Sequence, residues 1–183
     1  MQPLKIVLMS VAAAVFYGVA HDQVTARVCV EYFTIGHPPV FGTDDPTLLG
    51  IGWGVIATWW VGLLLGVPLA VVARAGPRPK RSVGSLVRPV MWLLAIMAAS
   101  ALVAGVTGWL LARSGAVFLV GPIAHELPAD RHVPFLADPW AHSASYVVGL
   151  IGGAVVLMLV WRSRGRTVLT PDNEGGNIPV DGP

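Results

Sequence analysis

The segment LLGIGWGVIATWWVGLLLGVPLAVV, residues Leu48 to Val72, decides the fold of this chain. It carries no charged residue over more than the roughly 20 apolar residues that a helix needs to cross a membrane. Three other apolar stretches reach or approach that length, at Leu4 to Ala20, Val87 to Leu111 and Trp140 to Trp161. The sequence therefore predicts an all-α fold, a four-helix transmembrane bundle with spans at about 4–33, 46–73, 87–112 and 139–162.

The composition supports the same class of protein. The chain is 55% hydrophobic and 12% charged, with a mean hydropathy of +0.69, whereas soluble domains carry about 25% charged residues. The loops are too short for a separate globular domain, so residues 1–166 are predicted to form one membrane domain whose main partner is the lipid bilayer. The positive charges lie beside the predicted spans, as is typical of membrane proteins. The net charge of +2 therefore does not indicate nucleic-acid binding.

The distribution of positive charge predicts the orientation. Lys and Arg are retained on the cytoplasmic side of plasma-membrane proteins, and we predict that this protein lies in the inner (plasma) membrane of a bacterium. We therefore expect both termini to be cytoplasmic, residues 22–46 and 113–139 to form two outer loops, and residues 167–183 to be a flexible cytoplasmic tail. Nine of the twelve Lys and Arg residues flank the predicted inner segments: Lys5, Arg74, Arg78, Lys80, Arg81, Arg88, Arg162, Arg164 and Arg166.

Local signals mark several helix ends. Asp45 before Pro46 and Asp138 before Pro139 each resemble an N-cap followed by proline at the first helical position, so helices are expected to begin there. The first helix is expected to continue beyond Ala20 to about residue 33. An alternative interpretation treats the first span as a cleaved signal peptide, which would leave His21 at a new N-terminus able to chelate copper.

All five histidines lie in or beside the two outer loops. Neutral imidazole binds transition metals, and imidazole together with carboxylate suits zinc, whereas a ligand set with Cys29 or a near-planar nitrogen set would favour copper. Adjacent helical residues such as His21 and Asp22 point about 100° apart, so any imidazole and carboxylate pair must come from tertiary contact. We expect a subset of the following to meet above the bundle: His21, His37, His125, His132 and His142, with Glu31 or Glu126.

Two kinds of function follow from this pattern. If a metal with an open coordination position binds, Glu126 or Glu31 could act as the general base of a metal-dependent hydrolase at the outer surface. The alternative is a non-catalytic membrane subunit, or a pH-responsive protein, whose outer loops bind a membrane or periplasmic protein. In that case the histidines cap helices and bind backbone carbonyls instead of a metal. Asp22 and Arg27 are expected to form an ion pair near the membrane surface.

One stretch also resembles a known group of proteins. It comprises Tyr17 and Gly18, the run from Asp22 to Glu31, the Tyr32-Phe33-Thr34 triplet, and His37 with Pro38. The stretch from Asp22 to Pro38 resembles one in uncharacterised bacterial multi-pass membrane proteins. The resemblance covers a tenth to a fifth of the chain. It implies a membrane location and no activity.

Overall fold

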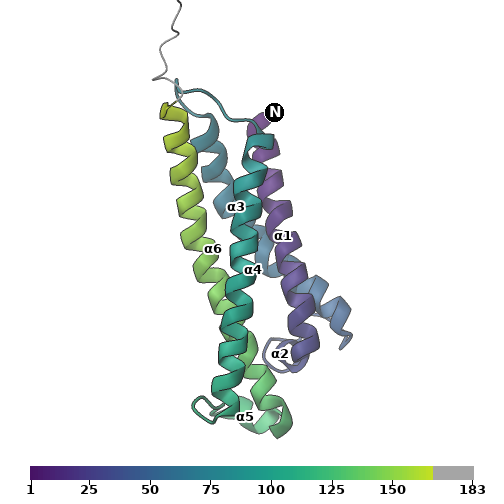
Figure 1. Ribbon diagram of the computed structural model, residues 1–183. Helices are drawn as coiled ribbons and strands as arrows, with labels where there is room; N and C mark the ends of the chain where they lie inside the picture. Colours follow the sequence, from purple (N-terminus) through teal and green to yellow (C-terminus); the bar gives the residue numbers. More distant parts are fainter. Residues whose placement is uncertain (167–183) are drawn as a thin grey trace, which may run out of the picture.

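The computed structural model describes residues 1–166, and the described chain is helical (Figure 1). The predicted tail at 167–183 lies outside the described residues. Four long helices are joined by short helices and loops. In chain order the elements are α1 (Gln2–Val28), α2 (Glu31–Thr34), α3 (Pro46–Arg74), α4 (Val83–Arg113), α5 (Pro122–Glu126), the 3-10 helix η1 (Ala129–Arg131) and α6 (His132–Arg166).

The four long helices are each long and apolar enough to cross a membrane, which confirms the predicted four-helix transmembrane fold. Their outward faces are rich in large apolar side chains, including Trp59, Leu64, Leu102 and Leu150. Water would strongly disfavour such a surface, whereas lipid chains match it. The protein is therefore a membrane protein whose outer surface contacts lipid.

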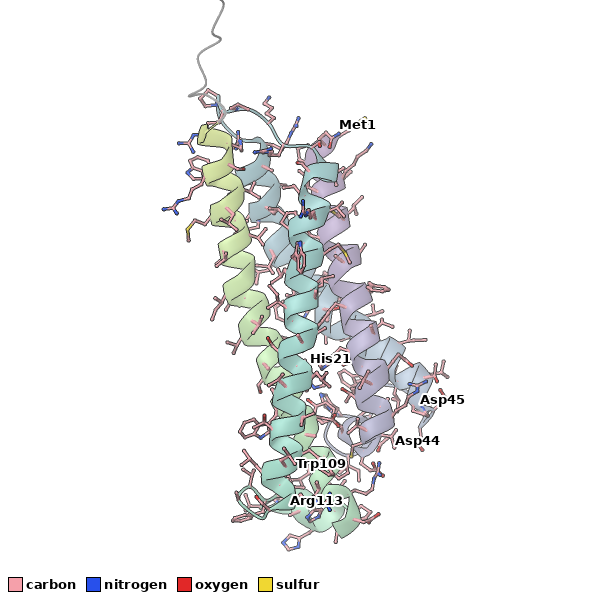
Figure 2. All side chains as sticks on the ribbon, in the orientation of Figure 1. Met1, His21, Asp44, Asp45, Trp109 and Arg113 are labelled. Atoms are coloured by element: carbon pink, nitrogen blue, oxygen red, sulfur yellow. The ribbon has the colours of Figure 1, made fainter. Side chains whose placement is uncertain are left out.

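The four long helices alternate in direction, and different residues lie at the two ends of the bundle (Figures 1 and 2). We call them the Met1 end, which also holds the end of α6, and the Asp45 end, where α3 begins. At the Asp45 end the Asp45 carboxylate accepts a hydrogen bond of 2.8 Å from the Leu48 backbone N–H. This N-cap was predicted, and it confirms the start of α3.

The bundle consists of two tightly packed antiparallel pairs. α1 packs along α3 and α4 packs along α6, whereas contacts between the two pairs are much fewer. Glycines make the first pair possible: a Cβ on Gly54 would lie 2.5 Å from Val19 Cα, and one on Gly62 would lie 2.6 Å from Val11 Cα. The small residues of α3 thus mediate its close packing on α1, because only glycine lets these backbones approach.

Glycines also allow close packing in the second pair, α4 and α6, but here they lie against large side chains. A Cβ on Gly108 would lie 2.5 Å from the Trp140 ring, and one on Gly149 would lie 3.0 Å from Met97. Each glycine thus leaves a recess that a large side chain of the neighbouring helix fills. The shortage of such contacts between the two pairs leaves space at the centre of the bundle.

Two predicted helix ends were wrong. α1 ends at Val28, because Cys29 adopts an extended backbone and α2 begins separately at Glu31. α6 begins at His132 instead of at Asp138. Asp138 and Pro139 therefore lie inside a helix, and the aspartate side chain is buried instead of capping a helix start.

The Met1 end is closed by a buried arginine. Arg164 of α6 has no exposed surface, and its guanidinium donates to the carbonyl oxygens of Val72, Ala75, Arg78 and Pro79. The last carbonyls of α3 have no partner within their own helix, so this cation satisfies them and complements the negative end of the helix dipole. Arg164 thereby joins the two helix pairs at this end.

Candidate functional site

The two segments predicted to be outer loops, at residues 22–46 and 113–139, pack against each other at the Asp45 end, and we call this packed region the cap. Glu31 and Arg131 form an ion pair at 2.8 Å, and the rings of Tyr32 and Phe135 lie 5.7 Å apart. Burial alone would raise the pKa of Glu31, but the Arg131 hydrogen bond and further donors outweigh it, so its pKa lies below the ordinary value. Glu31 therefore serves to hold the cap together as an anion.

Cys29 lies beneath this ion pair and is fully buried. Its thiol lies 3.3 Å from Glu31 Oε2 and donates to it. Burial, and then the hydrogen bond to Glu31, raise the pKa of Cys29 to about 12. Because the thiolate is the metal-binding form, a thiol that stays protonated is a poor copper ligand at neutral pH.

Three of the five histidines do not contribute to a shared site. His37 Nδ1 lies 2.7 Å from the Tyr32 carbonyl oxygen, and His132 Nε2 lies 3.0 Å from the Leu127 carbonyl oxygen. His125 is exposed, as is its neighbour Glu126. For His37 and His132, the structure therefore matches the alternative in which histidines bind backbone carbonyls.

The other two histidines meet inside the bundle, on the Met1 side of the cap. His21 of α1 and His142 of α6 lie edge to face, with ring centroids 4.4 Å apart and an interplanar angle of 89°. Asp22 joins them: one ligand atom from each of His21, Asp22 and His142 lies within 4.8 Å of the others. Among residues 1–166 this is the group of side chains that could hold a metal ion.

Neighbouring groups fix the orientation of His142. Its Nδ1 lies 2.9 Å from the Asp138 carbonyl oxygen, and its ring stacks on Tyr32 with centroids 4.8 Å apart. A carbonyl oxygen can only accept, so Nδ1 must carry the proton and Nε2 is left to face Asp22. This is the usual arrangement of a metal-binding histidine, whose second nitrogen donates to a carbonyl or carboxylate.

The contact between His142 Nε2 and Asp22 Oδ1 measures 3.2 Å. If the imidazole is neutral, both atoms present lone pairs to each other, which is unfavourable for groups as buried as these. A proton or a metal ion must then lie between them. A second proton on His142 gives an ion pair, a proton on the Asp22 carboxyl gives a neutral hydrogen bond, and a metal ion would be bound by both groups.

His21 contributes an unsatisfied atom to the same place. Its Nε2 is buried and has no hydrogen-bond partner, whereas buried polar atoms normally have one. Asp138 Oδ2 is the second such atom in the described part of the chain. Unpartnered polar atoms beside a group of possible ligands are expected where a ligand or ion binds.

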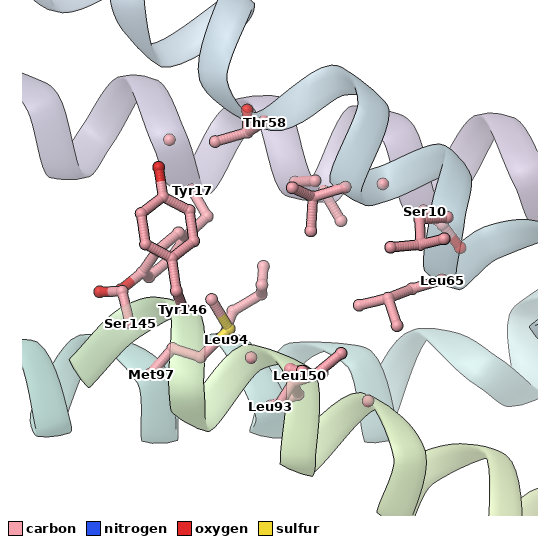
Figure 3. A pocket seen from close by; sticks show the side chains of 18 of the residues that line it. Ser10, Tyr17, Thr58, Leu65, Leu93, Leu94, Met97, Ser145, Tyr146 and Leu150 are labelled. Atoms are coloured by element: carbon pink, nitrogen blue, oxygen red, sulfur yellow. The ribbon is translucent and has the colours of Figure 1, made fainter. Parts of the chain in front are cut away.

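An apolar cavity extends from this cluster towards the Met1 end. It has a volume of about 410 Å³, and His21, Asp22 and His142 lie on its wall. Figure 3 shows Tyr17 and Ser145 at one end of the cavity, with Ser10 and Leu65 towards the other. The Tyr17 hydroxyl and Ser145 Oγ lie 2.7 Å apart and share a hydrogen bond. The site is therefore polar near the Asp45 end and apolar towards the Met1 end.

Comparisons with protein-family models, with curated proteins and with solved structures find no match for this chain. The fold and the site thus define only a class: a four-span helical membrane protein with a buried histidine and aspartate cluster between its two helix pairs.

The sequence pattern did not identify the complete cluster. It named His21 and His142 among five histidines, but placed Asp22 in an ion pair with Arg27, which is wrong. Arg27 instead donates to the backbone and side-chain oxygens of Gln23, at 2.8 and 2.7 Å. Asp22 recurs four residues after Gly18 on the face of α1, and this spacing was the available sign that Asp22 points into the bundle.

Proposed function

We propose that this protein binds a divalent transition metal, zinc in the first place and copper as the alternative, through His21, Asp22 and His142. The observation that carries the proposal is the convergence of three possible ligand atoms within 4.8 Å of one another, with His142 Nε2 at 3.2 Å from Asp22 Oδ1 and the buried His21 Nε2 without a partner. Two imidazoles and one carboxylate form a ligand set that zinc sites commonly use.

The geometry requires a small adjustment to accept the metal. Bonds of about 2.0 to 2.2 Å to a tetrahedral zinc place ligand atoms about 3.4 Å from one another. The three side chains now offer atoms within 4.8 Å of one another. A rotation of His21, whose Nε2 has no hydrogen bond to break, would bring the third ligand into place.

Three protein ligands leave one coordination position for water or a substrate, as in catalytic zinc sites. For a metal-dependent hydrolase, the sequence predicted Glu31 or Glu126 as the general base. Glu31 is held by Arg131 and Glu126 is exposed, and neither belongs to the metal-competent group. The proposal is therefore metal binding, and hydrolysis remains a prediction for substrate screening.

Charge supports an outward-facing site. Nine of the twelve Lys and Arg residues lie towards the Met1 end, whereas Arg27, Arg113 and Arg131 lie towards the Asp45 end, as does the cluster (Figure 2). Since Lys and Arg stay on the cytoplasmic side, the Asp45 end would face outwards, from a plasma membrane with both termini inside.

The decisive experiment is metal analysis of the purified full chain. We expect one zinc per chain after gentle purification or zinc reconstitution, and at least a tenfold loss of zinc affinity in His142→Ala and in His21→Ala. His125→Ala is the matched control, because that histidine is exposed, and it should retain the metal. Unchanged zinc affinity in the His142→Ala variant would overturn the proposal. Absence of metal after reconstitution, together with a partner that co-purifies, would favour the docking alternative.

A further inference from the structure

We infer that the cavity beneath the histidine cluster binds the single hydrocarbon chain of an uncharged membrane amphiphile, whose oxygen-bearing head lies at Tyr17 and Ser145. This inference goes beyond metal binding, since it depends on the cavity and on hydroxyl groups that are not metal ligands. It follows from the shape of the cavity, its lining and its access to lipid.

The cavity is elongated. It extends along α6 from His142 to Leu157 and along α1 from His21 to Ser10, which corresponds to about 17 to 22 Å of helix axis. A cavity of this length that runs parallel to the helices matches the shape of an extended hydrocarbon chain.

The lining is apolar along this length. Leucine and methionine side chains project into the cavity from three helices, including Leu65, Leu93 and Met97 (Figure 3). A hydrophobic cluster that includes Ile6 and Leu69 closes the Met1 end. A cavity of this kind excludes water, since it offers water no hydrogen-bond partner, but it would accept a hydrocarbon chain.

The polar end determines the head group. Tyr17 and Ser145 supply two hydroxyls, and neither residue belongs to the metal-competent group. The lining of the cavity includes no Lys or Arg that would balance an anionic head. A hydroxyl or an ester carbonyl fits these groups. The head would lie towards the Asp45 end and the chain would point to the bilayer centre, as for a lipid of that leaflet.

A second cavity supplies the access route. It has a volume of about 580 Å³ and lies across Tyr17 and His21 from the first, between α1, α4 and the start of α6. The exposed side chains Phe16, Val24 and Leu102 form part of its lining, so this cavity reaches the lipid-facing surface. An amphiphile could therefore arrive laterally from the bilayer.

The test uses photoreactive probes with a diazirine at the end of the chain, added to the full-length protein in lipid nanodiscs. One probe is a monoacylglycerol and the other an isoprenoid alcohol, which distinguishes the two sources of such a chain. We expect labelling to concentrate on the cavity residues Leu65, Leu93 and Met97. Ala57→Phe, which places a ring in the cavity, should reduce this labelling at least fivefold. Ala99→Phe on the exposed face of α4 is the matched control and should leave it unchanged.

A second variant covers the case in which Ala57→Phe does not fold. Tyr17→Phe removes only a hydroxyl, and it should weaken retention of the alcohol probe severalfold while leaving a probe without a head oxygen unaffected. Equal labelling of lipid-facing residues outside both cavities, such as Leu110 and Leu159, insensitive to these changes, would show annular lipid only and would overturn the inference. The labelling should persist in the presence of a metal chelator. Binding of the hydrocarbon chain and binding of the metal are therefore tested separately, and either result can be negative while the other is positive.

Discussion

Asp22 of α1 and His142 of α6, 120 residues apart in the chain, meet at 3.2 Å in the interior of the bundle. This contact joins the two helix pairs near the Asp45 end, as Arg164 joins them at the Met1 end. Between these two polar connections the pairs have few contacts and the cavity separates them. Each connection therefore links the two helix pairs at one end of the cavity.

Two substitutions of Asp22 should separate its structural role from its role in metal binding. Asp22→Leu leaves His142 Nε2 buried without a partner, which should lower the free energy of unfolding by about 1 to 3 kcal/mol. Asp22→Asn can donate an amide N–H to Nε2, so its stability should stay close to wild type while zinc binding is lost. Unfolding in detergent and metal analysis measure the two effects. Asp44→Leu at an exposed site is the control, and equal zinc binding by wild type and Asp22→Asn would contradict the prediction.

The Glu31 and Arg131 pair should make the cap sensitive to acid. The pKa of Glu31 is lower in the folded protein than its ordinary value of 4.5. Its stabilising contribution is therefore complete above pH of about 4.5 and is lost as the pH falls through the lower, folded-state pKa. Both side chains are partly exposed, so the loss should be about 0.2 to 1 kcal/mol. Unfolding from pH 7 to pH 3 should show this loss in wild type and in Glu126→Gln, but not in Glu31→Gln.

Arg164 should matter more than any other arginine near the Met1 end. Arg164→Met leaves the partly buried carbonyl oxygens of Val72 and Ala75 without their donor, which should cost about 1 to 3 kcal/mol. Arg164→Lys keeps the charge but cannot reach four carbonyls with one planar group, so an intermediate loss is expected. The exposed Arg162→Met is the matched control. Equal unfolding midpoints for the Arg162 and Arg164 variants would show that the carbonyl contacts contribute nothing.

Two glycines offer a paired test of helix packing. Gly54→Ala would place a Cβ 2.5 Å from Val19 Cα, so α1 and α3 would have to separate, at a cost of about 1 to 3 kcal/mol. Gly84→Ala lies in α4 with nothing within 4 Å, and it should stabilise the helix by about 0.5 to 1 kcal/mol. Thermal unfolding of the two variants should therefore shift in opposite directions. A shift in the same direction would mean that the close approach is not needed.

The long spans were predictable because membrane insertion depends on local composition. A run such as Leu48 to Val72 must satisfy its own backbone hydrogen bonds in lipid, and helix is the structure that does so within one segment. The Asp45 cap was equally local. The end of α1 and the start of α6 were not, since Cys29 is extended where it packs below the cap, and α6 gains its first turn through contacts with the other outer loop.

The sequence by itself determined that this is a four-span helical membrane protein with its histidines near one end, since hydrophobicity and charge act residue by residue. Only the tertiary structure decided which imidazoles come together. His21 and His142 face each other because glycine contacts set the depth at which α1 packs on α3, and the contacts of α4 with α6 set the depth of His142. His37 and His132 use a ring nitrogen on nearby backbone carbonyls. The contact of His142 with His21 and Asp22 joins residues about 120 positions apart, so no local pattern records it.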